Sequence, residues 1–397
     1  MSKISYKNTL LKVLTTLLFF YVFNLEIVDK AGFDRFDTFS ISKIFRIIWL
    51  GTIIISIIVL IDYRIFIKKQ NMKLFIYLLL VINSILLSSY GNNPIAYYRW
   101  IELFFVAIGV MTVINFTEKN KNLNLDIIIQ KSVFFNFQVI LAVLLAFTIL
   151  NPEMAYQLES QGRFRLGGSL YSPNLLGIIL TLSFLSSLIV LKRNILIFST
   201  FLITSILIYL TDSRTSLLIY AFCVLLLIWK KTIFTKAIIL FSFSILFMFL
   251  LESIISSVDK SGDLSTINNR LPIYETIIAG IKTHPLTGLG YVEGVRYYLD
   301  QNFPQSFWKP PHTHNSYLET LSSLGIIFGS LTLLYIFKIL IYSIRTIAAS
   351  KDNLKNIISI QIIAILLGAL TIPTFGNIVN PTFAFLIFFL IEKNRAI

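Results

Sequence analysis

The chain has 397 residues, of which 56% are hydrophobic and only 14% are charged, and its mean hydropathy is +0.79. A water-soluble domain cannot bury that much apolar surface, so the composition excludes an ordinary soluble protein and predicts an all-α, polytopic membrane protein. The formal net charge of +14 is then expected in cytoplasmic loops rich in Lys and Arg, and no nucleic-acid partner is expected. Cys223 is the only cysteine, which excludes an intramolecular disulfide and a thiolate metal cluster.

Apolar runs close to 20 residues, the length that crosses the hydrocarbon core of a bilayer, predict about twelve transmembrane helices. The expected spans are 10–27, 44–61, 74–90, 100–116, 133–150, 173–191, 195–210, 215–229, 237–251, 316–340, 357–373 and 381–391. The last of these runs is short. The first is expected to be an uncleaved helix, because no small-residue cleavage site follows it.

The distribution of Lys and Arg predicts which loops face the cytoplasm. With both termini inside, the predicted inner segments contain 21 Lys and Arg residues and the short outer segments contain eight. The positive-inside rule therefore predicts cytoplasmic N- and C-termini. The expected domains are the first nine spans at 1–251, an extracytoplasmic loop domain at 252–315 and the last three spans at 316–397.

The long outer loop is expected to contain short helices. Four apolar residues at helical spacing predict an amphipathic helix, which is expected to end at Pro285, and one or two helical turns are expected at 295–299. The four residues are Leu271, Tyr274, Ile278 and Ile281. Aromatic side chains of this loop, such as Trp308, could stack on sugar rings or lie at the membrane interface, and the sequence leaves both interpretations open.

His312 and His314 are two of only three histidines in the chain, and they lie where the loop meets a long apolar run. Ser316 and Glu319 fit a capping box, with Ser316 as N-cap, and this explains Glu319 without a catalytic role. A capping box does not explain two histidines. Free backbone N–H groups at the helix start suit a phosphate or pyrophosphate. The alternative is zinc bound by His312 and His314, with His284 or a carboxylate as third ligand.

Arginines recur on the same predicted outer face. Arg163 and Arg165 precede a helix start in which Ser172 is the expected N-cap and Pro173 the first helical residue. Arg214 lies in a tight turn between two apolar runs, and Arg270 begins the loop helix. A guanidinium suits a phosphate group, although the arginines could also be solvated, and Arg214 could pair with its neighbour Asp212.

Four stretches together resemble the O-antigen ligase and polymerase superfamily of bacterial surface-polysaccharide glycosyltransferases. The first is His-Thr-His-Asn-Ser-Tyr-Leu-Glu at 312–319, followed by Gly325. The others are Arg165 with Pro173-Asn174-Leu175-Leu176-Gly177, the turn Ser213-Arg214-Thr215, and Arg270 and Tyr274 ahead of His284-Pro285-Leu286-Thr287-Gly288-Leu289-Gly290. Many relatives have Trp where this chain has Tyr274.

The resemblance implies a GT-C-like glycosyltransferase that uses a polyprenyl-pyrophosphate-linked oligosaccharide at the outer face of the cytoplasmic membrane, without a metal or another cofactor. Capsule, exopolysaccharide or O-antigen would be the product, and other polysaccharide assembly proteins would be partners. His314, Asn315 and His312 are the expected catalytic residues. The arginines 163, 165, 214 and 270 are expected to bind pyrophosphate, and the expected substrate-binding residues are Asn174, Tyr274, His284 and Trp308.

Three functions remain open from the sequence. A repeat-unit polymerase transfers the growing glycan to a lipid-linked acceptor, whereas a ligase transfers it to lipid A core or to a protein. Because both reactions have the same leaving group, the residues do not separate them. A transporter or flippase for lipid-linked sugars would instead place polar residues along a path through the membrane, and few ionisable residues lie deep in the expected spans.

Overall fold

The computed structural model describes residues 3–20, 41–62, 69–120, 122–158, 164–168, 170–229, 270–304, 309–377 and 379–393. The chain divides into two compact units, and each is described by itself. The first unit comprises Met1–Leu79, Tyr98–Asp212 and Val379–Ile397. The second comprises Leu80–Tyr97 and Ser213–Ile378.

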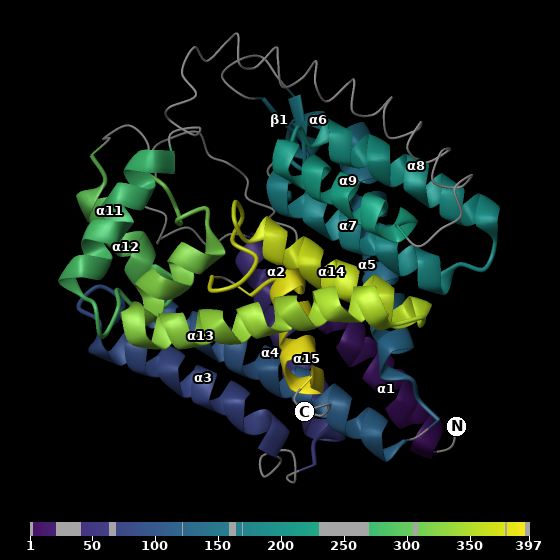
Figure 1. The fold of residues 1–397 in the computed structure, drawn as a ribbon, viewed down its shortest axis with the longest axis horizontal. Helices are drawn as coiled ribbons and strands as arrows, with labels where there is room; N and C mark the ends of the chain where they lie inside the picture. The colour runs from purple at the N-terminus through teal and green to yellow at the C-terminus, as the bar shows by residue number, and fades with distance from the viewer. Residues whose placement is uncertain are drawn as a thin grey trace. The chain divides into compact units, whose positions relative to one another are not determined.

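The first unit consists mainly of helices that pack against one another (Figure 1). Its elements are α1 (Lys3–Leu18), α2 (Ile41–Leu60), α5 (Leu125–Leu150), α6 (Pro152–Ala155), β1 (Tyr156–Leu158), β2 (Phe164–Leu166), α7 (Pro173–Val190), α8 (Asn194–Leu210) and α15 (Pro381–Lys393). It shares α3 (Lys69–Leu87) and α4 (Pro94–Lys119) with the second unit. Phe19 stacks on Phe388 with a centroid distance of 5.4 Å, so the end of α1 packs on α15.

A buried ionic group joins α2 to α4 in the first unit. Glu102 is fully buried, and it accepts hydrogen bonds from Arg46 and, at 3.0 Å, from Arg99. A buried carboxylate is tolerated when opposite charges and hydrogen bonds compensate for its lost hydration, as they do here.

The second unit contains α9 (Arg214–Ile228), α11 (Arg270–Thr283), α12 (Glu293–Asn302), α13 (Ser316–Ala349) and α14 (Asn353–Gly368). In Figure 1 the two short helices α11 and α12 lie beside α13, and α14 lies along it. Apolar residues of α11, α12 and their connection form one core. These residues are Ile273, Ile277, Leu289, Val295, Tyr298, Leu299 and Phe303.

Two glycines lock the connection after α11 against α13. Gly325 has φ 76° and interrupts the helical conformation of α13, and a Cβ there would lie 2.4 Å from the carbonyl oxygen of Leu286. Gly288 has φ 71°, and its Cβ would lie 2.5 Å from the carbonyl oxygen of Ser323. Backbone approaches backbone at this point, which only glycine permits. Two hydrogen bonds hold the contact, from the Leu289 N–H to the Ser322 carbonyl and from the Ile326 N–H to the Pro285 carbonyl, each 2.7 Å.

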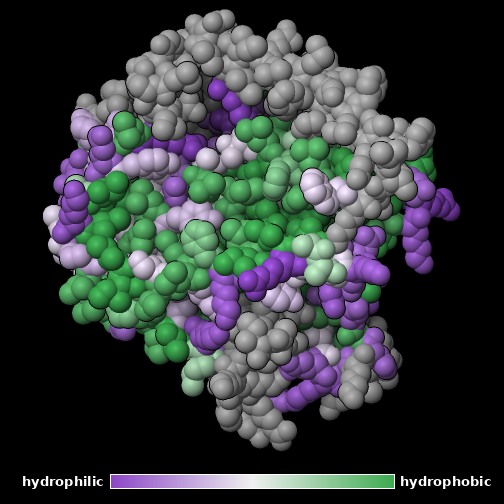
Figure 2. Space-filling view, viewed as in Figure 1, coloured by the Kyte–Doolittle hydropathy of each residue, from purple (hydrophilic) through white to green (hydrophobic). Residues whose placement is uncertain are grey.

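Four described helices are long and apolar enough to cross a membrane: α4, α5, α7 and α13. Helix α13 also exposes large apolar side chains, including Leu331, Leu334 and Phe337. Figure 2 shows hydrophobic residues over much of the described surface on the side that it views. A helical membrane protein is therefore confirmed, although the number of spans expected from the sequence is not. Of the expected spans, 237–251 lies outside the described residues, as does the end of 10–27.

The structure differs from the sequence-based expectation in three local respects. A two-stranded antiparallel ribbon, in which Gln157 pairs with Arg165, interrupts the all-α pattern. Helix α1 begins at Lys3 and ends at Leu18, earlier than the apolar run indicated. The loop helix buries Ile273 and Ile277, and not Leu271 and Ile278, which are 43% and 44% exposed. Two sets of apolar residues in this helix have helical spacing, and the set that contains Ile273 and Ile277 is the one that packs in the core.

Candidate functional site

Asn315, and not Ser316, caps the helix that follows the histidines. Its Oδ1 accepts hydrogen bonds from the N–H groups of Tyr317 at 3.0 Å and Leu318 at 3.1 Å. The expected capping box is therefore wrong. The Ser316 hydroxyl instead donates to the carbonyl of Ile372 at 2.9 Å, and so fastens the helix start to the segment after α14. The cap uses two of the N–H groups that we expected to be free for an anion.

The two histidine rings lie against each other. Their centroids are 4.1 Å apart with an interplanar angle of 68°. The backbone N–H of His314 donates to Nδ1 of His312 at 3.2 Å, so the proton of a neutral His312 ring lies on Nε2. His314 has φ 55°, a left-handed conformation that costs a residue with a Cβ about 1 kcal/mol. The loop therefore holds this histidine in a conformation that it would not adopt alone.

Both imidazoles are held in the neutral form. Burial, and then the positive charge of Arg270, lower the pKa of His314 to about 4. Burial also lowers the pKa of His312 well below its ordinary value, and repulsion from the protonated form of His314, from Arg296 and from Arg270 lowers it further. A neutral imidazole can accept a proton, so both rings are in the state that a general base requires.

Arg270 and Arg214 are half-buried cations on helices of the second unit. Arg270 is the first residue of α11, and Arg214 is the first residue of α9, directly after the N-cap Ser213. Within the described ranges, neither guanidinium forms an ion pair or a hydrogen bond with protein. A partly buried arginine in this state is suited to bind an anion in a fork geometry.

Arg296 is a further cation near His312, and the sequence patterns did not indicate it. Its Nη1 donates to both carboxylate oxygens of Glu293, at 3.1 and 3.3 Å, and its Nε donates to the carbonyl of Pro311 at 3.3 Å. Glu293 is only 2% exposed. The pair thus ties α12 to the residue just before His312. An acidic and a basic residue three positions apart, Glu293 and Arg296, were the available signal in the sequence.

Glu319 was also missed, because the capping box had explained it. Its Oε2 accepts the N–H of Thr313 at 2.9 Å, and its Oε1 accepts Nδ2 of Asn377 at 3.2 Å. The side chain is almost completely buried. Glu319 therefore bonds to the backbone between the two histidines, and no sequence pattern pointed to Asn377 as its partner.

Arg165 belongs to a separate cluster in the first unit. Its Nη2 donates to Oδ1 of Asn174 at 2.9 Å, and its Nε donates to the carbonyl of Thr211 at 3.0 Å. Arg165 lies on β2 and Asn174 is the second residue of α7, whose N-cap is Ser172 as expected. The structure thus brings two of the predicted site residues together.

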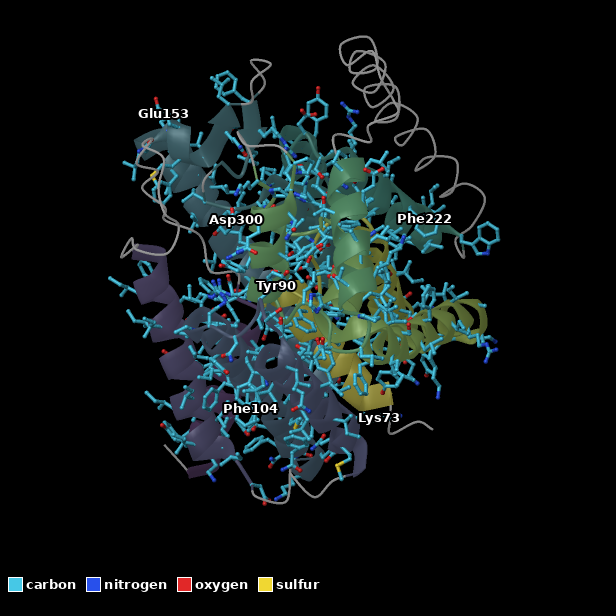
Figure 3. All side chains as sticks on the ribbon, turned by 90° about the vertical axis from the view of Figure 1, so that its left-hand side faces the viewer. Lys73, Tyr90, Phe104, Glu153, Phe222 and Asp300 are labelled. Carbon is cyan, nitrogen blue, oxygen red and sulfur yellow. The ribbon has the colours of Figure 1, made fainter. Side chains whose placement is uncertain are left out.

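The remaining predicted site residues have varied surroundings. His284 is half-buried and meets the ring of Tyr90 edge-on, with centroids 5.5 Å apart; Figure 3 labels Tyr90. Tyr274 packs against the apolar core of the second unit. Arg163 and Trp308 lie outside the described residues.

A metal site was the alternative use of the two histidines. Among the described residues, no three His, Cys, Asp or Glu side chains gather closely enough to hold a metal ion. Two acidic residues lie beside residues 312–315, the histidine loop. Glu293 bonds to Arg296, and Glu319 bonds to Thr313 and Asn377.

Residues 199–334 match a family described as O-antigen ligase. The match includes Arg214, Arg270, His284, the histidine loop and Gly325, but it begins after Arg165 and Asn174. No curated protein matches the chain. The family match confirms the resemblance to the O-antigen ligase and polymerase superfamily, a family of membrane enzymes that transfer glycans.

Proposed function

We propose that this protein is a polysaccharide repeat-unit polymerase with a GT-C-like arrangement of about twelve spans in the cytoplasmic membrane. It transfers a glycan from a polyprenyl pyrophosphate carrier to the terminal sugar of a second lipid-linked oligosaccharide, at the outer face of that membrane. Capsule, exopolysaccharide or O-antigen is the product. Both termini are cytoplasmic.

One observation carries this proposal. His314, a neutral histidine, lies within the electrostatic reach of Arg270, two residues before the candidate membrane span α13. A base and a cation at the end of a membrane helix suit a substrate whose lipid is in the bilayer and whose pyrophosphate is at the surface. The family match over 199–334 includes both residues.

The proposed reaction is a single displacement at the anomeric carbon. The acceptor hydroxyl attacks that carbon, a new carbon–oxygen bond forms, and the bond to the pyrophosphate oxygen breaks. His314 takes the proton of the hydroxyl, and the polyprenyl pyrophosphate leaves as an anion. Because the leaving group needs no protonation, one base and stabilising cations suffice, unlike the paired carboxylates of glycoside hydrolysis.

The cations of the proposed site are Arg214, Arg270 and Arg165, with Arg163 as a further candidate. They bind the pyrophosphate and stabilise the charge that develops as it leaves. Asn315 orients the loop by capping α13, and His312 is the alternative base. Asn174, Tyr274, His284 and Trp308 are proposed to contact the sugars.

Transfer to lipid A core or to a protein, as by a ligase, is the alternative, and the family description favours it as much as a polymerase. Transport of lipid-linked sugars is the second alternative. It predicts polar residues along a path through the membrane, on which the substrate would move.

The deciding experiment is the profile of lipid-linked glycans in a strain from which the gene is deleted. Loss of a polymerase leaves single repeats on the lipid, loss of a ligase leaves long chains, and loss of a flippase leaves repeats on the cytoplasmic leaflet. Single repeats on the outer leaflet would support our proposal. Either of the other profiles would replace it with the corresponding alternative.

The orientation has its own test. In a Cys223→Ser background, Asp300→Cys on α12 should react with an impermeant thiol reagent in cells whose outer layers admit the reagent, and Lys351→Cys should not. Both positions are exposed, and Figure 3 labels Asp300. The opposite labelling would reject an outer active site.

A further inference from the structure

The carboxylate of Glu319 is a buried group that the proposed reaction does not use. It is 1% exposed, and each of its oxygens accepts a hydrogen bond from a different segment of the chain. One donor is the backbone N–H of Thr313, in the histidine loop, and the other is the side chain of Asn377, after α14. Because a buried carboxylate is costly without donors, these two bonds hold the three segments together.

The first bond acts on the backbone between the two histidines. Thr313 is buried, and its Oγ1 donates to the carbonyl of Asn315 at 2.7 Å and accepts the N–H of Asn315 at 3.2 Å. His314, between them, has φ 55°. The backbone conformation of His314 determines the direction of its Cα–Cβ bond, and so where the imidazole can lie. Glu319 therefore helps to set the direction of the His314 imidazole.

The second bond leads to a segment that is itself held firmly. The Asn377 carbonyl accepts the Tyr291 hydroxyl at 2.7 Å, and the Asn377 side chain is 3% exposed. Just before it, the N–H groups of Thr374 and Phe375 donate to the Ser316 hydroxyl at 2.8 and 3.3 Å. This segment lies beyond the end of the family match at residue 334, so the match does not point to it.

We propose that Glu319 and Asn377 are a positioning pair that orients His314, and that the segment 369–377 is thereby part of the active site. The proposal rests on the proposed function, because it concerns how His314 is aimed. Neither residue touches the reacting atoms. A pair that served packing alone would change the amount of folded protein. A positioning pair changes kcat in protein that has folded.

The test exchanges the two polar groups. Asn377→Asp removes the amide that donates to Glu319 and leaves two carboxyl groups in one buried site, which cannot both be charged. In the double variant Glu319→Gln with Asn377→Asp, the new amide oxygen can still accept the Thr313 N–H, and the new amide nitrogen can donate to the carboxylate introduced at position 377. The expected result is a kcat about 10²-fold lower for Asn377→Asp with KM nearly unchanged, since small misplacements of a catalytic group have effects of that order. The double variant should recover at least about tenfold of this loss, because contacting residues are not additive.

Two further measurements keep the result unambiguous. Glu102→Gln is the control, because Glu102 is also a fully buried carboxylate with two donors, but in the other unit. It should reduce the yield of folded protein while kcat of the folded fraction stays within about twofold of wild type. Amide hydrogen exchange of the full-length protein, measured at peptides covering 312–318, gives a readout that does not depend on activity. Exchange there should rise in Asn377→Asp, fall back in the double variant and stay unchanged in Glu102→Gln.

The outcomes separate the pair from the function. An unchanged kcat in Asn377→Asp, or a double variant no better than Asn377→Asp alone, overturns the positioning pair. If the wild-type protein transfers no glycan at all, the proposed function fails. The exchange data then decide the pair by themselves: protection lost in Asn377→Asp and restored in the double variant supports it, and unchanged protection overturns it.

Discussion

Arg165 in the first unit and the pair Arg270 and Arg214 in the second differ in how the protein uses their guanidinium groups. Arg165 donates to Asn174 and to the carbonyl of Thr211, so its fork is engaged by protein. Arg270 and Arg214 make no such bonds with described residues, yet the charge of Arg270 lowers the pKa of the neighbouring histidine. Arg165 therefore holds protein segments together, whereas the guanidinium groups of Arg270 and Arg214 remain available to a ligand as far as the described residues show.

This difference changes what each arginine is expected to contribute. An arginine bonded to two protein acceptors fixes the backbone, and its loss is felt first in structure. An arginine without protein acceptors exerts its charge on whatever lies next to it, and its loss is felt first in binding and chemistry. The sequence had assigned all of these arginines one role.

The largest effect is expected at His314, the residue whose pKa the charge of Arg270 lowers. His314→Ala should reduce the initial rate of chain extension by about 10²–10⁴-fold, since a general base contributes that much, while the protein still inserts. His314→Gln should be about as poor, because an amide cannot accept a proton near neutral pH. The rate is measured with a defined lipid-linked repeat. Substantial activity of the Gln variant would reject the base and favour His312 or a purely positional role.

A smaller effect, about 10–10²-fold on kcat/KM, is expected for Arg270→Ala and Arg214→Ala, since a charge-assisted contact contributes about 1.5–3 kcal/mol. The lysine variants of both residues should recover only part of this loss, because lysine keeps the charge but loses the planar fork.

Arg165→Lys sharpens the contrast between the two groups. It should lower the thermal stability of the purified protein as well as its activity, because a lysine cannot reach both Asn174 and Thr211 in the same geometry. Melting temperature and initial rate are measured on the same preparation. Equal stability losses in Arg165→Lys and Arg270→Lys would remove the distinction.

The pH dependence of the rate tests whether the charge of Arg270 acts on His314. Because burial and Arg270 lower the pKa of His314 to about 4, kcat/KM should stay constant as pH falls from 7 and decline only as pH approaches 4, where the ring becomes protonated. In Arg270→Ala the decline should begin at a higher pH, since one of the two causes is removed. An anionic pyrophosphate bound nearby favours the protonated ring, so the limb of kcat should lie above that of kcat/KM. A wild-type limb of kcat/KM near pH 6.5 would show that His314 is not buried beside a cation.

The smallest expected effect is that of chelation. If His312 and His314 act as a base and its neighbour, EDTA should leave the rate of the purified protein unchanged. Loss of activity with EDTA and recovery with Zn²⁺ would instead support the histidines as ligands.

The sequence predicted what periodicity and residue type determine locally. Apolar runs predicted most helices of the described part, Pro173 indicated a helix start, and two rare histidines indicated the candidate site. The sequence-based prediction was wrong where a polar side chain could bond either to its own helix or to a distant segment. Ser316 looked like an N-cap, but its hydroxyl bonds to the segment at 372–375, so Asn315 caps the helix in its place.

The same limit explains the missed site residues. Glu319 and Asn377 are 58 residues apart, and nothing in the spacing of the chain relates them. The pairing of Arg296 with the carbonyl of Pro311 likewise depends on how α12 packs, which local patterns do not encode. Partners chosen by tertiary packing are therefore outside the reach of a single sequence.

The bond between Glu319 and Asn377 also sets an order of events during synthesis. The histidine loop leaves the ribosome well before the segment that anchors it, because α14 lies between them. At about 5–20 residues per second, those 58 residues take several seconds to make. Until they are made, the backbone at His314 is held only by hydrogen bonds within 312–319. Helix α13 must then insert before Asn377 can bond to Glu319 near its N-terminus. The histidine loop therefore reaches its final geometry among the last parts of the molecule. A nascent or truncated chain that lacks Asn377 contains both histidines, but the bond that helps to orient His314 is missing.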